Sequence, residues 1–299
     1  MVSLAARLRA STIRVHLAGI QFVNTILGFD ASPFTEDRLR LILRGIQRHQ
    51  AITLPPRPPR IPISLHHLYT IFRFTAASRT TGDARCFKAA LCLAFFGLLR
   101  ISEFTCPSPT SFDPSLHLSI NDIAFSTNPD LLHVRIKQSK TDGFRRGCIV
   151  RVARTNNYFC PFDAIVSFLR VHPRCPGPLF TLGDGSFLTR ADIQSILRLS
   201  FPLVDPAVIG SHSLRIGGAS MLCSLGVPDA TIQVMGRWSS NAFRRYLRIS
   251  HEAIARIHSQ MAAHACTFSR HWYPDTRQSG PPRDAPRSVD DPSIVGNRR

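Results

Sequence analysis

The stretch that decides the fold class is "LLHVRIKQSKTDGFRRGCIVRVAR", residues 131–154. In its first part Leu132, Val134 and Ile136 alternate with polar residues, which is the period of a half-buried strand. The segment "GCIVRVAR" at its end predicts a second strand, and the Asp-Gly pair between the two is typical of a turn. With "LHLSINDIAF" (116–125) as a preceding strand, we expect a small antiparallel sheet.

Helical patterns lie on both sides of this sheet. Residues 65–99 precede it and hold the longest apolar run, "AALCLAFFGLL" (89–99), which is too short to cross a bilayer and is typical of a buried helix. Further helical patterns follow the sheet, the last of them at residues 251–265. The first begins with Pro161 in its first turn, and the second has Thr189 as a cap with Asp192 three residues on. The expected fold class is mainly α with a small antiparallel β-sheet (α+β).

A proline-rich segment, "LPPRPPRIPIS" (54–64), divides the chain. So many prolines exclude a helix and predict a stiff extended linker. Residues 1–53 before it carry two helical patterns, at 4–29 and at 34–50, and Thr35 is the expected cap of the second. A short helical region is therefore expected to precede the rest of the chain.

Two regions follow the linker. Residues 65–268 contain the predicted sheet and the later helices, and we interpret them as one larger domain. Residues 269–299 are rich in Pro, Arg, Asp and Ser and are expected to be disordered.

The charge balance favours a polyanionic partner. The chain has 299 residues with 37 Lys and Arg against 19 Asp and Glu, a net charge of +18. Such a balance points to nucleic acid, and a basic protein without a specific partner is the alternative. Almost every basic residue is arginine, which binds phosphate oxygens in a bidentate manner; the lysines are Lys88, Lys137 and Lys140.

The eight cysteines show neither a CxxC pair nor zinc-ligand spacing with histidine. We interpret them as reduced, mostly buried thiols of an intracellular protein. Arginines run through the apolar N-terminal segment, so no signal peptide is expected. The sequence predicts no metal and no other cofactor.

Two short segments carry candidate site residues. "GLLRISEF" places Arg100 at the end of a buried helix, and Glu103 shares its helical face if the helix continues. "SHSLRIGG" places His212 and Arg215 three residues apart at the start of another helix. Each pair also has an ordinary interpretation, as a surface ion pair in the first case and as a capping or core histidine in the second.

Two glycines and one lysine add to these candidates. Gly217 and Gly218 cost about 1 kcal/mol each against alanine inside a helix, so either another element or a phosphate is expected to approach that backbone closely. Lys140 lies in the connection between two strands, where a flexible ammonium can reach a substrate or simply face solvent. Lys137 is its nearby rival.

The segment "MGRWSSNAFRRYLR" (235–248) contains Trp238 and, eight residues later, Tyr246. A phenol attacks at neutral pH only if a base takes its proton and other groups stabilise the new charge. Breaking a phosphodiester in this way needs guanidinium or N–H donors aimed at the non-bridging oxygens, and an acid for the leaving 5′-oxygen. A packed aromatic on a basic helix is the alternative for Tyr246.

The motifs occur in an order that resembles the tyrosine recombinase (phage integrase) family. The order is G-L-L-R-x-S-E, a lysine between two strands, H-S-L-R with small residues after it, G-R-W, and then a tyrosine. The chain resembles especially the recombinases of eukaryotic DIRS-like and Crypton-like mobile elements, and it is similar to Cre in its Trp variant, the Trp of the G-R-W motif. The resemblance covers about residues 12–265, and five motifs in this order are a strong signal where each alone is weak.

The resemblance implies a role for each matching residue. Arg100 and Arg215 would clamp the scissile phosphate, Glu103 would buttress the site, Lys140 would protonate the leaving 5′-oxygen, His212 would assist proton transfer, Trp238 would donate its indole N–H to a phosphate oxygen, and Tyr246 would be the nucleophile.

The same resemblance implies a fold and a reaction. The helical region 1–53 would be a partial core-binding domain and residues 65–268 the catalytic domain, together forming a clamp on double-stranded DNA. Strands would be cleaved and rejoined through a covalent 3′-phosphotyrosyl bond without ATP or metal. A homo-tetramer on two duplexes is implied, with residues 251–265 either docking on a neighbour or packing on their own domain. No membrane or small-molecule partner is expected, and a eukaryotic protein would act in the nucleus.

Two departures from the family pattern are visible. The spacing from Trp238 to Tyr246 is one residue shorter than in Cre, so the intervening loop must absorb a rotation of roughly 100°. The helical region before the linker is shorter than is usual in the family. A catalytically inactive DNA-binding relic of a mobile element is therefore one alternative, and a type IB topoisomerase, which uses similar chemistry as a monomer, is another.

Overall fold

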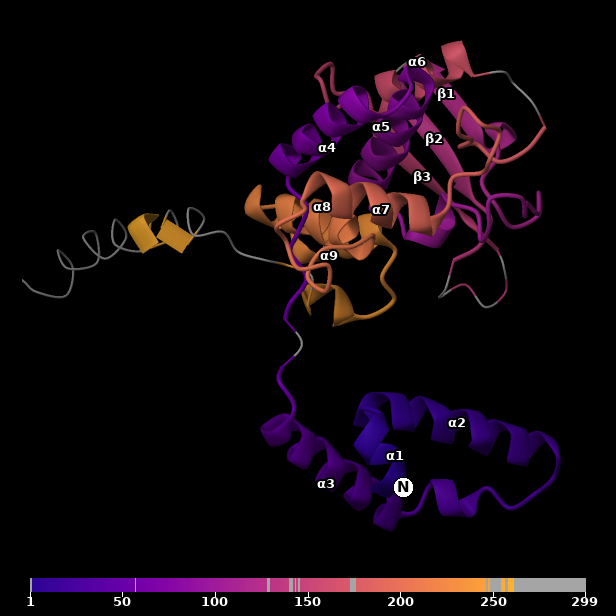
Figure 1. Cartoon of the computed structure of the whole chain (residues 1–299), viewed down its shortest axis with the longest axis vertical. Helices are drawn as coiled ribbons and strands as arrows, with labels where there is room; N and C mark the ends of the chain where they lie inside the picture. The colour runs from indigo at the N-terminus through magenta and orange to yellow at the C-terminus, as the bar shows by residue number, and fades with distance from the viewer. Residues whose placement is uncertain are drawn as a thin grey trace, which may run out of the picture.

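A three-stranded antiparallel sheet in the order β1-β2-β3 lies within an otherwise helical chain, as the computed structural model in Figure 1 shows. The mainly α fold class with a small antiparallel sheet is thus confirmed. The strands pair Leu132 with Val152 and Val134 with Val150, so the alternating apolar residues share one buried face. The strands are β1 (Ile123–Thr127), β2 (Asp130–Ile136) and β3 (Cys148–Ala153).

The first strand begins later than predicted. Residues 116–122 are not part of β1, and Ile120–Asp122 form a 3-10 turn, η3. The Asp122 carboxylate accepts from the Ser119 backbone N–H and hydroxyl, at 2.8 and 2.7 Å. This local capping competes with strand pairing and delays the strand by seven residues relative to the predicted start at 116.

The structure describes most of the chain. The described residues are 2–56, 58–127, 130–139, 142, 144, 146–172, 176–245, 247, 254–255 and 258–260. Over this part, no helix is both long and apolar enough to cross a membrane. The predicted tail 269–299 and most of the predicted helix 251–265 lie outside the described residues.

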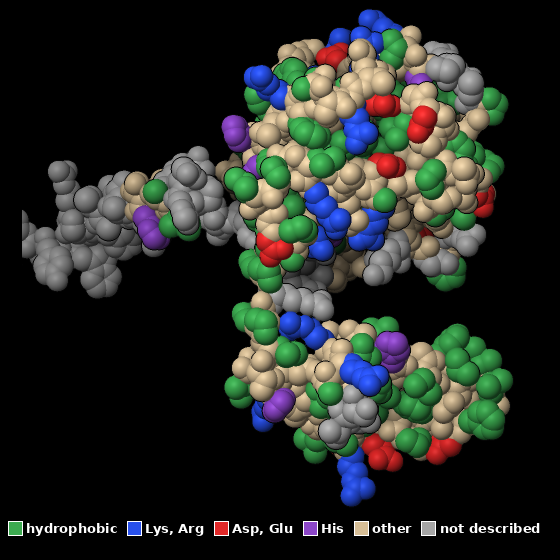
Figure 2. All heavy atoms as spheres, in the orientation of Figure 1, with side chains coloured by type: hydrophobic (Ala, Val, Ile, Leu, Met, Phe, Trp, Pro, Cys, Tyr) green, Lys and Arg blue, Asp and Glu red, His purple; other side chains and the backbone are tan. Residues whose placement is uncertain are grey.

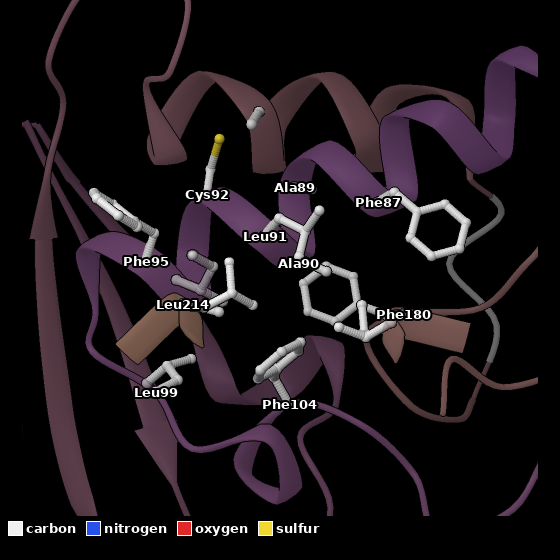
Figure 3. Close-up of a cluster of buried hydrophobic side chains, with 14 of the residues drawn as sticks. Phe87, Ala89, Ala90, Leu91, Cys92, Phe95, Leu99, Phe104, Phe180 and Leu214 are labelled. Atoms are coloured by element: carbon white, nitrogen blue, oxygen red, sulfur yellow. The ribbon is translucent and has the colours of Figure 1, made fainter. Parts of the chain in front are cut away.

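The core is built around α5 (Thr81–Phe96), which packs against α4 (Leu65–Ser78), α6 (Pro161–Val171) and α8 (His212–Ser224). Nine of its residues are buried, as the apolar run predicts. Figure 3 shows side chains from α5 meeting Phe104, Phe180 and Leu214, which come from three other parts of the chain. Burial of this kind is the main stabilising term in folding.

The remaining helices after the sheet are α7 (Arg190–Ser200), α9 (Asp229–Gly236) and the 3-10 helix η4 (Asn241–Arg245). Two predicted helix starts are confirmed. Pro161 is the first residue of α6, and Thr189 and Asp192 form a capping box at the start of α7, where the Thr189 hydroxyl lies 2.6 Å from the Asp192 carboxylate.

The N-terminal region is a separate helical unit of α1 (Val2–Arg7), α2 (Ala10–Ile26) and α3 (Asp37–Thr53) (Figure 1). Gln50 of α3 is buried and bonds the backbone of Ala5, Leu8 and Ala10. The prediction that Thr35 caps the second helix is wrong. Its hydroxyl instead donates to the Ser32 carbonyl at 2.9 Å, and α3 begins two residues later.

The proline-rich segment is extended, and its C-terminal part packs on the larger unit. The Ile61 N–H donates to the Val208 carbonyl at 2.7 Å, and the Ile63 N–H donates to the Ser213 carbonyl at 3.0 Å. The Ile63 side chain is fully buried in the main core. Only the first residues of the segment 54–64 therefore span between the two units.

Six cysteines lie in the described part of the chain, and all six are free thiols. Four of them, Cys86, Cys92, Cys106 and Cys160, are buried. Burial raises the pKa of Cys92 to about 12, so this thiol stays protonated at neutral pH. The four buried thiols serve as packing groups, in agreement with the expectation of mostly buried cysteines.

Candidate active site

Arg100 and Glu103 follow α5 in a turn, not on a continued helix. The helix ends at Phe96, Leu98 takes a φ of 47°, and Arg100 has extended backbone. A 3-10 turn, η2 (Ile101–Glu103), then brings the Glu103 carboxylate back to Arg100. The expectation that the two share a helical face is wrong, because the left-handed residue Leu98 ends the helical path.

The Glu103 carboxylate is buried and holds Arg100 at two points. It accepts from the Arg100 backbone N–H at 2.8 Å and from the Arg100 Nη1 at 2.9 Å. The side chain of Glu103 is 1% exposed and that of Arg100 17%. The pair is thus not the solvated surface pair of the ordinary interpretation, and removal of either partner would leave a charge poorly solvated.

Arg215 lies on the first turn of α8 and is 1% exposed. Its guanidinium donates to the carbonyl oxygens of Leu98 and Gly236, and it stacks on the Trp238 ring with 4.2 Å from Cζ to the ring centroid. A fixed guanidinium of this kind is oriented before any ligand arrives. The residues that orient it come from two segments far apart in the sequence, one at Leu98 and one at Gly236 and Trp238.

His212 is the first residue of α8 and is partly buried. Burial, and after it the positive charge of Arg215, lowers the pKa of His212; Arg60, Arg100 and Arg190 act in the same direction. The imidazole is therefore neutral at pH 7, and a neutral imidazole can accept a proton as well as donate a hydrogen bond.

Backbone, not phosphate, approaches the two glycines of α8. A Cβ on Gly217 would overlap with the Ile63 carbonyl, and a Cβ on Gly218 would lie 2.5 Å from the Phe95 carbonyl oxygen. Both glycines therefore let α8 pack closely on α5 and on the proline-rich segment. Of the two alternatives left open by the sequence, the close approach of another element is the correct one. This packing sets the position of Arg215 one turn earlier.

Trp238 follows the end of α9 and covers Arg215. Its ring folds back over Gly236, where a Cβ would overlap with the indole carbons. It packs with Phe243 at a centroid distance of 5.6 Å, in a small cluster that includes Ala219 and Ile232. In the structure, Trp238 thus acts as a packing and stacking group for the buried guanidinium.

Arg237 is a site residue that the sequence interpretation missed. Its Nη2 donates to the Glu103 carboxylate at 2.7 Å and to the Leu98 carbonyl at 3.2 Å. Glu103 thereby bridges Arg100 and Arg237, and the Leu98 carbonyl accepts from both Arg215 and Arg237. The available signal was an arginine directly after a helix-ending glycine, in the motif G-R-W.

Lys140 and Tyr246 lie outside the described residues, but their neighbours are placed. Gln138 and Ser139 line a cavity of about 130 Å³ together with Arg237. Phe243 and Leu247 pack into the cluster that contains Trp238. These four described neighbours therefore adjoin the arginine cluster.

The rival lysine, Lys137, is occupied elsewhere. Its ammonium lies 2.5 Å from the Asp122 carboxylate and 2.9 Å from the His117 carbonyl oxygen. The side chain is 15% exposed. This pairing ties the end of β2 to the turn that precedes β1, which gives Lys137 a structural role and leaves Lys140 as the candidate acid.

The charge of the cluster is unbalanced. Arg100 and Arg237 share one carboxylate, that of Glu103, and Arg215 joins them through the Leu98 carbonyl, which Arg237 also contacts. Cys148 lies at its edge: burial raises the pKa of its thiol, on which Arg237, Glu103 and Arg100 also act electrostatically. An excess of fixed guanidinium groups in a partly dry environment favours a bound anion. Within the described ranges, no group of three or more His, Cys, Asp or Glu side chains could hold a metal ion.

Comparisons with known proteins give matches among solved structures. No family model matches the chain, and a search of curated proteins gives no match. The XerH site-specific recombinase bound to its difH substrate is 17% identical, with a TM-score of 0.49 over 67% of this chain. Because 52% of XerH is covered, the chain spans about half the length of that protein.

Two further structures match over more of their length. The XerA recombinase is 14% identical with a TM-score of 0.48, over 87% of both chains. The Tn1549 transposon integrase in complex with circular intermediate DNA is 13% identical with a TM-score of 0.47, over 83% of this chain and 85% of the integrase. At such identities and TM-scores the likeness carries no argument about the reaction of this chain.

Proposed function

We propose that this protein is a tyrosine recombinase that cleaves and rejoins strands of double-stranded DNA through a covalent 3′-phosphotyrosyl intermediate. The observation that carries the proposal is that Glu103 fixes Arg100 and the Leu98 carbonyl fixes Arg215, while His212, three residues before Arg215 on α8, lies close enough to feel the charge of both guanidiniums. Guanidinium groups fixed by buried partners are what the charge on a pentavalent phosphorus requires. The motif order in the sequence supports the same function.

In the proposed reaction the Tyr246 oxygen attacks the phosphorus and the bond to the 5′-oxygen breaks. Lys140 gives its proton to that leaving oxygen, and neutral His212 assists removal of the phenol proton. Arg100 and Arg215 bind the non-bridging oxygens. Attack by a 5′-hydroxyl on the phosphotyrosine reverses each step, so the energy of the phosphodiester is kept and neither ATP nor a metal ion is needed.

The partner in this proposal is duplex DNA, and the net charge of +18 supports it. Lys and Arg side chains lie on both the small helical unit and the larger unit in the view of Figure 2. Binding that neutralises phosphates releases counterions, so affinity should fall steeply with salt. Assembly of four protomers on two duplexes, and action in the nucleus of a eukaryotic cell, belong to the same proposal through the family resemblance.

A covalent trapping assay tests the function. The protein is incubated in EDTA with a pool of labelled, nicked duplexes of random sequence, and DNA-linked protein is counted on a denaturing gel. We expect an adduct with wild type and none with Tyr246→Phe, because the attacking oxygen is lost. Tyr69→Phe is the matched control, since Tyr69 is exposed on α4 and keeps its ring contact as phenylalanine.

Two results would contradict the proposal. One is a wild type without adduct, which would instead suit an inactive DNA-binding protein. The other is equal adduct with Tyr246→Phe. Relaxation of supercoiled DNA by the monomer would favour a topoisomerase over a recombinase.

A further inference from the structure

Arg237 has a backbone conformation that favours glycine. Its φ and ψ are 56° and 45°, in the left-handed region. Its N–H donates to the Val234 carbonyl, and the Trp238 N–H donates to the Gln233 carbonyl, both close to 3 Å. These two bonds define a Schellman motif at the end of α9, in which Arg237 occupies the position where glycine is commonest.

The side chain of Arg237 is also incompletely paired. Its Nη2 bonds Glu103 and Leu98, but within the described part of the chain its Nε and Nη1 are buried without a hydrogen-bond partner. Buried N–H donors without acceptors destabilise a fold. An arginine whose backbone is held in the left-handed region destabilises it as well. Glu103 would keep both bonds from Arg100 if Arg237 were absent. Stability alone therefore gives no reason for an arginine at this position.

The contacts of Arg237 join the two arginines of the proposed phosphate clamp. Glu103 accepts from the Arg100 guanidinium through Oε1 and from the Arg237 guanidinium through Oε2, which also accepts from the Arg100 backbone N–H. The Leu98 carbonyl accepts from both Arg237 and Arg215. A shift of Arg237 would therefore move the partners that orient Arg100 and Arg215.

We propose that Arg237 is a positioning residue: through Glu103 and the Leu98 carbonyl it holds the Arg100 and Arg215 guanidiniums at the separation at which both bind one phosphate group. This inference rests on the proposed function. It adds a third arginine to the site, one that acts through the other two and not on the DNA directly.

The informative variant is Arg237→Gly, which removes the guanidinium and suits the left-handed backbone. The melting temperature should stay within about 2 °C of wild type or rise, because the backbone strain is relieved. Under single-turnover conditions the rate of covalent adduct formation should fall about 10–100-fold, as is typical for loss of a group that orients a site residue. The Kd for an uncleaved duplex should change little, since the proposed clamp binds one phosphate group among the many of a duplex.

A double-mutant cycle separates positioning from a merely structural role. If Arg237 acts through Glu103, then adding Glu103→Gln to Arg237→Gly should cost much less than Glu103→Gln costs alone. Arg154→Gln is the matched control, because Arg154 is exposed, pairs with Asp130 and Asp163 at the edge of the sheet, and loses the same charge. The control should keep the wild-type rate.

Binding of inorganic phosphate, measured by calorimetry without DNA, distinguishes the inference from the function. Arg237→Gly should weaken phosphate binding about 10-fold, equivalent to 1.4 kcal/mol, and Arg154→Gln should not. If wild type forms no adduct but Arg237→Gly still loses phosphate affinity, the proposed function fails and the positioning role stands. Wild-type rate and phosphate affinity in Arg237→Gly would overturn the inference, as would a wild type that binds no phosphate.

Discussion

Two helices of almost equal length, α2 and α5, lie in opposite environments. In α5 nine residues are buried, whereas in α2 only Ala10 and Ile13 are. Ile20, Phe22 and Ile26 of α2 are each at least half exposed, and Figure 2 shows hydrophobic side chains gathered on the small helical unit. The two helices differ in what surrounds them more than in their apolar content.

The difference shows that a pattern of apolar residues predicts a helix, but it does not predict which elements will pack against that helix. Around α5 the chain supplies α4, α6 and α8, and the candidate site lies where α5 ends and α8 begins. Around α2 it supplies α1, η1 (Ser32–Phe34) and α3. Rigid placement of the arginine cluster therefore depends on the larger unit.

The largest effect should come from equal truncations in the two helices. Phe95→Ala removes a fully packed ring from α5 and should lower the free energy of unfolding by about 3–5 kcal/mol. Phe22→Ala in α2 removes a ring that is 66% exposed and should change it by about 0.5 kcal/mol or less. Denaturant unfolding of both variants measures this, and equal losses would show that the ring of Phe22 is as packed as that of Phe95.

Smaller changes in the free energy of unfolding are expected when two glycines are replaced by alanine, and the two changes should have opposite signs. Gly217→Ala places a Cβ against the Ile63 carbonyl and should destabilise by about 2–3 kcal/mol. Gly19→Ala in α2 meets no atom within 4 Å and should stabilise by about 1 kcal/mol, the ordinary helix preference for alanine. Destabilisation by both substitutions would mean that α2 is covered by something in solution.

The smallest effect should be a pH dependence carried by the packed region. The folded-state pKa of His212 is lowered from 6.5, first by burial and then by Arg215. Below about pH 6.5 this histidine binds a proton more readily in the unfolded chain than in the folded one. The stability of the fold therefore falls as the pH falls toward the folded-state pKa. In unfolding experiments between pH 7.5 and pH 5.5, the free energy of unfolding should fall less for His212→Gln than for wild type.

His16, exposed on α2, offers the matched control. His16→Gln makes the same substitution at an exposed position and so controls for the loss of one imidazole from the chain. The assignment to His212 fails if the two substitutions change the pH dependence equally.

Local patterns were sufficient for much of the fold. The alternation in β2 and β3 predicted both strands, and capping residues predicted the starts of α6 and α7. Where prediction failed, competing local bonds were the reason. Asp122 caps a turn and delays β1, and the Thr35 hydroxyl bonds Ser32 instead of capping α3.

The site was only partly predictable for a different reason. Motif order placed Arg100, His212, Arg215 and Trp238 in one site, and the described structure brings their segments together. Arg237 lies inside the motif G-R-W, but the motif does not show that this arginine pairs with Glu103, which is 134 residues away in the sequence. Helical spacing likewise misplaced Arg100, because the turn at Leu98 depends on tertiary contacts.

Identification of the amino acid that carries the DNA tests the central claim most directly. The adduct formed in EDTA with nicked duplex would be digested with nuclease and protease, and the modified peptide would be sequenced by mass spectrometry. We expect a nucleotide joined by a 3′-phosphodiester to Tyr246. A nucleotide on any other side chain, or a wild type that carries none, would contradict the account.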